Sequence, residues 1–142
     1  METYRLDQDI KLLCVKAESF PDGIIAAQDK LIAMTSGDSK SSYFGVSYLY
    51  DDKILYMAGV QTKERNENLL PGCEAFTLKA GNYISVYVSD FVQQTSLIEK
   101  TFKMLLDDPG IDPNGCCVEC YLPEGCNPAT ANDVRCMIRL AD

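Results

Sequence analysis

Cys117-Val118-Glu119-Cys120-Tyr121-Leu122-Pro123 is the stretch of sequence that decides the fold and directs attention to a function. It has the composition of a buried strand, with a proline at its end and a single acid in its middle. A carboxylate between apolar neighbours costs free energy unless a partner satisfies it. Glu119 is therefore the first candidate for a charged residue at the floor of a binding cleft.

The chain around this stretch repeats the order of its predicted elements, which indicates an internal duplication. Each half begins with an apolar run, continues with a helical pattern and ends in two strands. Tyr48 and Leu49 in the first half occupy the places of Tyr121 and Leu122 in the second. We predict two βαββ half-repeats, residues 8–62 and 74–141, related by a pseudo-two-fold axis within a single domain spanning residues 1–142. Neither half can bury a core alone, so the two must close on one another.

The first predicted helix has a start signal, a stop signal and an apolar face. Ser19 can cap its N-terminus with Pro21 in the first turn, where a missing N–H costs little. Gly37 can end it. Its apolar stripe consists of Ile24, Ala27, Leu31 and Met34.

The second predicted helix begins at Asp90 or at Thr95 and stops before Asp108-Pro109, because proline disfavours helix at the residue before it. Its apolar stripe consists of Ile98, Phe102 and Leu105. Both stripes are about one face wide, as expected for helices that lie on a sheet.

Strands fill most of the remaining sequence. Asp51-Asp52 is a tight hairpin signal, Ala80-Gly81 predicts a bend or bulge, and the polar residues 63–68 connect the two halves. Strands around only two helices make the fold α+β, with a mainly antiparallel, curved sheet. The predicted strands are Ile10–Ala17, Tyr43–Tyr50, Lys53–Gln61, Phe76–Lys79 leading into Asn82–Ser89, Cys116–Leu122 and Asp133–Leu140.

Side chains alternate along a strand, and this sorts the predicted strands into two faces. Aliphatic sets such as Ile84, Val86 and Val88 suit packing against helices. We therefore expect the two helices on one face of the sheet and, on the other, a cleft lined by aromatic residues and one acid. The residues expected to bind a ligand in this cleft are Glu119, Tyr121, Tyr48, Phe44, Val46, Tyr83, Tyr87 and Cys117.

Composition restricts the partners of the chain. Its 142 residues carry a net charge of −8 without a basic cluster, so direct binding to the nucleic-acid backbone is not expected. No run approaches the ~20 apolar residues of a membrane span, and the N-terminus lacks a signal-peptide pattern. Seven cysteines without a regular secreted spacing fit reduced thiols. We expect a cytoplasmic protein whose partner is a small molecule rather than nucleic acid or membrane.

Three strand motifs together resemble the GyrI-like effector-binding domain family. Tyr43-Phe44-Gly45-Val46-Ser47-Tyr48 is similar to its FG-x-x-Y strand, and Ala80-Gly81-Asn82-Tyr83 is similar to its G-x-Y strand. Val118-Glu119-Cys120-Tyr121-Leu122-Pro123 resembles its E-x-Y-x-P strand. The order and spacing of the motifs cover nearly the whole chain, from about Ile10 to Leu140.

The resemblance implies a duplicated βαββ fold that also serves as the ligand domain of multidrug-sensing transcription regulators. It further implies that Glu119 lies beneath aromatic residues and holds lipophilic, often cationic ligands. Such regulators carry a DNA-binding segment before this domain, whereas only a few residues precede Ile10 here. We therefore expect a stand-alone small-molecule binding protein.

Two other functions remain open at this point. In a hydrolase of small reactive electrophiles, Glu119 acts as the general base or nucleophile and Tyr121 orients the reacting group. A protein-interaction module, such as a gyrase inhibitor, would use an exposed edge or an acidic face instead. Its partner would be another protein or a second copy of the chain. A purely structural Glu119 would bond to a tyrosine or to Arg135 across the last hairpin.

A metal site is not expected, and neither is a cofactor. Cys117 and Cys120 form a C-x-x-C pair, but strand alternation puts their side chains on opposite faces, and the chain has no histidine. Buried thiols that pack as small apolar groups explain these cysteines better. The cysteine-rich segment Cys116–Cys126 is not a hallmark of the GyrI-like family, and its role is left open.

Overall fold

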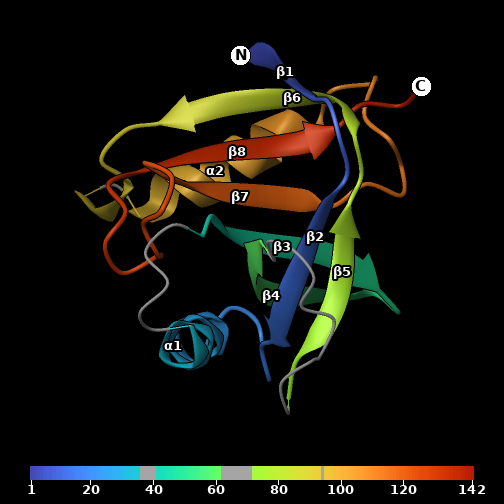
Figure 1. Cartoon of the computed structure of the whole chain (residues 1–142). Coiled ribbons are helices and arrows are strands. Elements are labelled where there is room, and N and C mark those ends of the chain that lie inside the picture. The colour runs from blue at the N-terminus through green and yellow to red at the C-terminus, as the bar shows by residue number, and fades with distance from the viewer. Residues whose placement is uncertain (36–40, 62–71, 94) are drawn as a thin grey trace.

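A curved antiparallel sheet with two helices on one face forms the molecule, as the α+β prediction requires (Figure 1). The computed structural model describes residues 1–35, 41–61, 72–93 and 95–142. The elements are β1 (Glu2–Leu6), β2 (Ile10–Lys16), α1 (Ile24–Met34), β3 (Tyr43–Tyr50), β4 (Lys53–Gln61), β5 (Glu74–Leu78), β6 (Gly81–Val88), the 3₁₀ helix η1 (Phe91–Gln93), α2 (Thr95–Leu106), β7 (Cys117–Leu122) and β8 (Asp133–Arg139).

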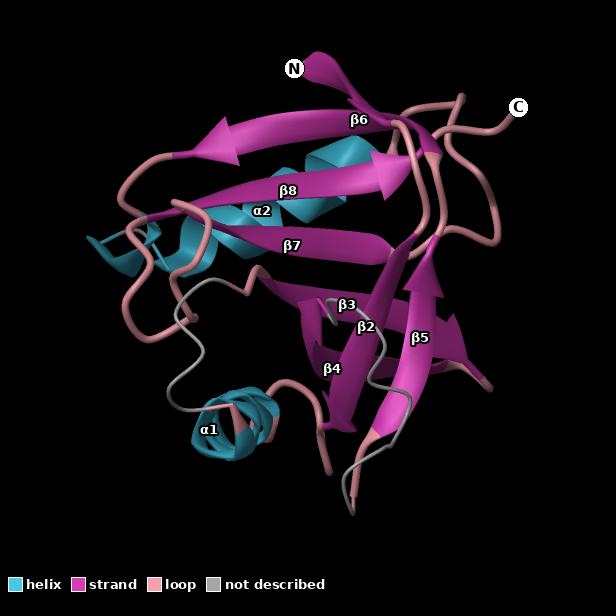
Figure 2. Ribbon diagram, in the orientation of Figure 1, coloured by secondary structure: helices cyan, strands magenta, loops and turns pink. Residues whose placement is uncertain are grey.

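The strand order of the sheet is β1-β6-β8-β7-β3-β4-β2-β5, with every neighbouring pair antiparallel. Outward from the β7–β3 junction, one side presents β7, β8 and β6 of the second predicted half, and the other side presents β3, β4 and β2 of the first. Strands at the two ends of the sheet run in clearly different directions in Figure 2, which reflects the curvature. The mirrored order is what a duplicated unit would produce, and the superposition of the halves stays a prediction.

Apolar side chains cover both faces of the sheet. On one face, α1 packs on β2 and β4 while α2 packs on β6 and β8. Ala27 and Leu31 of α1 share a buried cluster with Leu105 of α2. A second buried cluster, which contains Val46 and Val118, covers the opposite face. No helix in the described parts of the chain combines the length and the apolar content needed to cross a membrane.

Both helices begin later than their first sequence signals. Ser19 was expected to cap α1, but the helix starts at Ile24 after Gly23, and the Gly23 N–H donates to the Ser19 carbonyl at 3.1 Å in a preceding turn. For α2 the Thr95 start is the correct alternative, because Asp90 adopts a φ of 51° and residues 91–93 form η1. Gly37 and the polar connection 63–68 lie outside the described residues.

Strand β1 was not predicted, because its formation depends on residues far away in the sequence. It pairs with β6 at one edge of the sheet. The Arg135 guanidinium of β8 bonds to the Glu2 carboxylate at 2.6 Å and lies 4.5 Å from the centre of the Tyr4 ring. Strand β5 also differs from expectation. It was predicted to continue into the next strand, β6, but it pairs with β2 at the other edge of the sheet. Neither pairing can be predicted from short-range patterns in the sequence.

The β3–β4 hairpin matches its prediction residue for residue and offers a test of the turn. Asp51 and Asp52 have φ values of 54° and 63°, a left-handed conformation that costs an L-residue about 1–2 kcal/mol. Replacing the pair by Asn-Gly, the preferred sequence for such turns, should stabilise the protein by about 1 kcal/mol in urea unfolding. Asp52→Val, the control in the opposite direction, should destabilise it. An unchanged or lower midpoint for Asn-Gly would contradict the turn assignment.

Candidate functional site

Strands β3, β4 and β7 and helix α1 bring one acid and three polar side chains together on the helix face of the sheet. Glu119 and Tyr121 share this face because they lie two residues apart on β7. Tyr56 reaches it from β4 and Gln28 from α1. Strand β3 lies between β4 and β7, and its register places Gly45 directly opposite Glu119.

A chain of hydrogen bonds joins these groups. The Tyr121 hydroxyl donates to Oε1 of Glu119. The side-chain amide of Gln28 donates to the Tyr121 hydroxyl at 3.0 Å and to the Tyr56 hydroxyl at 3.0 Å. The two hydroxyl groups therefore have a common donor on α1, and the carboxylate has a partner on its own strand. We call Glu119, Tyr121, Tyr56 and Gln28 the Glu119 network.

Gly45 makes this arrangement possible because it has no side chain. A Cβ atom at this position would lie 2.7 Å from the Tyr56 hydroxyl oxygen and 3.1 Å from Oε1 of Glu119. The first distance is too short for any real contact, so a larger residue would displace the tyrosine. The glycine of the FG-x-x-Y motif thus brings the tyrosine and the acid together across β3.

Within the described parts of the chain, the Glu119 carboxylate has no compensating positive charge. Burial raises its pKa, while the hydrogen bond from Tyr121 acts in the opposite direction. Among the described residues no lysine or arginine forms an ion pair with it. Arg135, the alternative partner considered from the sequence, instead pairs with Glu2. The residue as a whole keeps part of its surface exposed, although its carboxylate is buried.

Neighbouring groups are neutral at ordinary pH and leave the acid as the single charge of the network. Burial, and then the charge of Glu119, raise the pKa values of Tyr56 and Tyr121. Cys136, which lies opposite Glu119 on β8, has its pKa raised to about 12 by burial first and by Glu119 second. Cys117 has its pKa raised to about 11, again mainly by burial. These thiols remain protonated and are poor nucleophiles.

Aromatic rings accompany the acid on this face. The Phe91 ring of η1 lies 5.8 Å from the Tyr121 ring, centre to centre, with the planes tilted by 56°. Tyr56 and Tyr121 are almost fully buried. A carboxylate flanked by aromatic rings and apolar thiols can hold a positive charge that is itself surrounded by hydrocarbon.

The structure divides the residues predicted for one cleft between the two faces of the sheet. Glu119, Tyr121 and Cys117 lie on the helix face, so their expected position on the face away from the helices was wrong. Phe44, Val46, Tyr48 and Tyr83 belong to the opposite face, as expected. Tyr87 follows Tyr83 in alternation, is 46% exposed and donates to Asp133. The error has a physical cause, because both faces are buried and hydrophobicity alone does not identify the face with the helices.

Two members of the Glu119 network were not selected from the sequence. Tyr56 lies in a strand, where tyrosine is favoured for packing alone, so its position in the sequence does not mark it as a site residue. Gln28 precedes Leu31 by three positions, so it lies on the apolar stripe of α1. A polar side chain on that stripe was the signal that could have identified it.

The cysteines divide as alternation predicts. Cys117 packs on the helix face and Cys120 on the opposite face. All seven cysteines are free thiols. Across the described ranges, no group of three or more histidine, cysteine, aspartate or glutamate side chains is arranged to hold a metal ion.

Comparison with known proteins supports the fold. No family model and no curated protein matches the sequence. The integron cassette protein VCH_CASS2, from the mobile metagenome of Vibrio cholerae, is similar in structure, with a TM-score of 0.65, 13% identity and coverage of 99% of this chain and 95% of that chain. The structure of SAV2435 bound to tetraphenylphosphonium gives a TM-score of 0.64 at 14% identity, covering 99% and 93%. A protein described as a bacterial transcription regulation protein, from Staphylococcus aureus MU50, gives 0.61 at 14% identity, covering 99% and 97%.

The raised pKa of Glu119 predicts how the stability of the protein depends on pH. A carboxyl group with a raised folded-state pKa binds its proton more tightly in the folded state, so its charged form opposes folding as the pH rises above its ordinary pKa of 4.5. Glu119→Gln keeps an oxygen that accepts from Tyr121 and removes this penalty. Thermal unfolding should therefore show the variant equal to wild type near pH 4 and at least as stable at pH 7. A variant that is clearly less stable at pH 7 would show that the charge itself holds the fold together.

Gly45→Ala tests the close approach of Tyr56 and Glu119. The added methyl group should displace the Tyr56 hydroxyl and lower stability by about 1–3 kcal/mol, the usual cost of overpacking. Gly59→Ala on β4 is the matched control, because the atoms nearest to its Cβ would be those of the Cys14 and Leu12 side chains, the closest at 3.2 Å, on the opposite face. NMR should show shifts of the Tyr56 and Tyr121 ring signals in the first variant and much smaller shifts in the second. Equal shifts in both variants would contradict the assigned role of Gly45.

Proposed function

We propose that this protein binds small lipophilic cations on the helix face of its sheet, with Glu119 as the countercharge. The observation that carries the proposal is the buried carboxylate, which among the described residues has a hydroxyl partner and no cationic one. Burial raises the pKa of this carboxylate in the free protein, and a bound cation would lower that pKa again. The buried charge therefore lowers the stability of the free protein, and a cationic ligand can remove this destabilisation.

The surroundings of Glu119 favour a ligand that is apolar around its charge. Phe91 is partly exposed and its ring lies against the buried Tyr121 ring, so an aromatic ring on this face can add about 0.5–2 kcal/mol of cation–π attraction. The hydroxyl groups of Tyr56 and Tyr121 already have Gln28 as a donor, so they offer little to a ligand that needs many hydrogen bonds. A bulky organic cation fits this chemistry better than a strongly hydrated one.

The fold supports the same proposal at a coarser level. One similar structure, SAV2435, holds the lipophilic cation tetraphenylphosphonium, and another is described as a transcription regulation protein. Together with the three strand motifs, this supports placing the chain among GyrI-like effector-binding domains. Seven free thiols fit action in the reducing cytoplasm.

Hydrolysis is a second candidate, because Tyr121 orients the Glu119 carboxylate through a hydrogen bond. With its raised pKa, Glu119 is a stronger base than an ordinary glutamate and could act on water or attack a strained electrophile. Turnover of a small epoxide such as styrene oxide, lost in Glu119→Gln by a factor of about 10² or more, would favour this function. Binding without turnover favours the proposal above.

The test compares two ligands that differ in charge and share their phenyl rings. Methyltriphenylphosphonium is a cation, and triphenylphosphine oxide is neutral. In isothermal titration calorimetry, Glu119→Gln should weaken the phosphonium by about 1.5–3 kcal/mol, the usual range for a charge-assisted contact, and leave the oxide nearly unchanged.

Glu124→Gln is the matched control for this test. Glu124 is exposed, lies just beyond β7 and carries the same charge, so its loss should change neither ligand measurably. Equal losses for both ligands in Glu119→Gln, together with a lower melting temperature, would overturn the proposal. Equal losses of phosphonium affinity in the two glutamine variants would show that the effect comes from the net charge of the chain and not from Glu119.

A further inference from the structure

The face of the sheet away from the helices carries a separate pocket of about 390 Å³. Its walls come from β3, β4 and β5 and from the segment between α2 and β7. This volume lies in the lower part of the range that small-molecule sites occupy. Met57 lines the pocket and lies in the cluster opposite the helices, whereas its neighbour Tyr56 belongs to the Glu119 network. One layer of backbone therefore separates the two sites.

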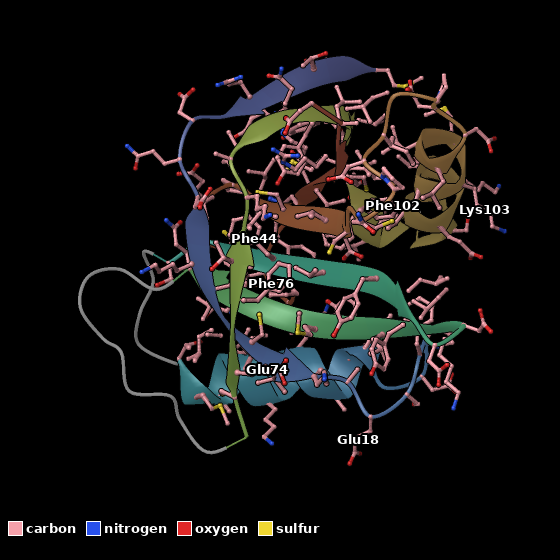
Figure 3. The ribbon with its side chains drawn as sticks, turned by 90° about the vertical axis from the view of Figure 1, so that its right-hand side faces the viewer. Glu18, Phe44, Glu74, Phe76, Phe102 and Lys103 are labelled. Atoms are coloured by element: carbon pink, nitrogen blue, oxygen red, sulfur yellow. The ribbon has the colours of Figure 1, made fainter. Side chains whose placement is uncertain are left out.

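The floor of this pocket is apolar and aromatic. Met57 is almost fully buried, and Tyr48 and Phe76 are partly buried against the same cluster. Phe76 lies on β5, two residues from Glu74, so both side chains project from the same face of the strand (Figure 3). An aromatic ring inserted here would contact two rings and a thioether, which are favourable partners.

The wall formed by Pro113–Cys116 is held by the rest of the fold. Asp112 donates its N–H to the Arg139 carbonyl at 2.9 Å, and its carboxylate pairs with the Arg139 guanidinium at 3.5 Å. The N–H of Gly115 bonds to the Asp112 carbonyl at 2.9 Å, and that of Asn114 bonds to the Asp112 carboxylate at 2.9 Å. These bonds fix the loop before any ligand arrives, so the pocket is preformed.

The negative charge of Glu74 favours a ligand that carries a positive charge. Of the described residues that line the pocket, Glu74 is the only charged one, and none of them is a lysine or an arginine. Its carboxylate is half-exposed and lies 3.8 Å from the Lys16 ammonium, a loose surface pair of low strength. An ammonium group on a ligand can take the place of Lys16 at little cost.

We propose that this pocket is a second binding site, which takes a small aromatic molecule with one ammonium group. The ring lies over Phe76, Tyr48 and Met57, and the ammonium group pairs with Glu74. The site is independent of the cation site at Glu119, because it lies on the other face and uses different side chains. Its occupancy can therefore be measured whether or not Glu119 binds a ligand.

The experiment follows methionine methyl signals by ¹³C NMR during a titration. The probes are 3-phenylpropylamine, which is charged at pH 7, and 3-phenylpropan-1-ol, its neutral counterpart. Met57 reports on the pocket, and Met34 of α1 reports on the helix face. Saturable shifts of Met57 at amine concentrations that leave Met34 unchanged are the expected result.

Two substitutions make the test specific. Glu74→Gln should weaken the amine roughly fivefold, the strength of an exposed charge pair, and leave the alcohol unchanged. Phe76→Ala should weaken both probes. Glu99→Gln, which removes a glutamate of α2 that is likewise paired with a lysine but more exposed (73% against 49% for Glu74), should change neither. A Met57 signal that does not move at millimolar amine, or that responds identically in the Glu74 and Glu99 variants, would overturn the proposal.

Discussion

The pairing of β3 with β7 is the constraint on which the rest of the molecule depends. It joins the two sides of the sheet and places Gly45 opposite Glu119. Because β3 also pairs with β4, the same register brings Tyr56 across the bare glycine to the acid. A shift of one residue would turn Glu119 towards the other face and expose Val118 to the helices. The fold and the candidate site therefore share a single register.

Glu119 is also where stability and the proposed binding of a cation oppose each other. Its carboxylate is buried and has no positive partner among the described residues. Burial therefore raises its pKa and its charge disfavours the folded state at neutral pH, although the Tyr121 hydroxyl offsets part of the cost. Natural proteins retain such residues where function requires them. On this account the rest of the protein is built to be stable enough to tolerate the charge. Well-packed clusters on both faces of the sheet provide that stability.

Local patterns in the sequence were sufficient for much of the fold and for the central acid. The bounds of β3 and β4 follow from alternation and the Asp51-Asp52 turn, and Glu119 was selected because it interrupts an apolar strand. Alternation correctly separated Cys117 from Cys120 but not the helix face from the opposite face, since both are apolar. Strand β1 and the partner of β5 depend on contacts between distant residues. Gln28 was missed for a related reason: its role appears only when α1 lies over the two tyrosines.

The pKa of Glu119, measured by ¹³C NMR of its side-chain carboxyl carbon with and without methyltriphenylphosphonium, tests the central claim most directly. In the free protein the titration midpoint should lie above 4.5, because burial disfavours the charged form. Saturation with the cation should move the midpoint downward, because the positive charge stabilises the carboxylate. A midpoint at or below 4.5 in the free protein, or one that the bound cation leaves unchanged, would contradict the account.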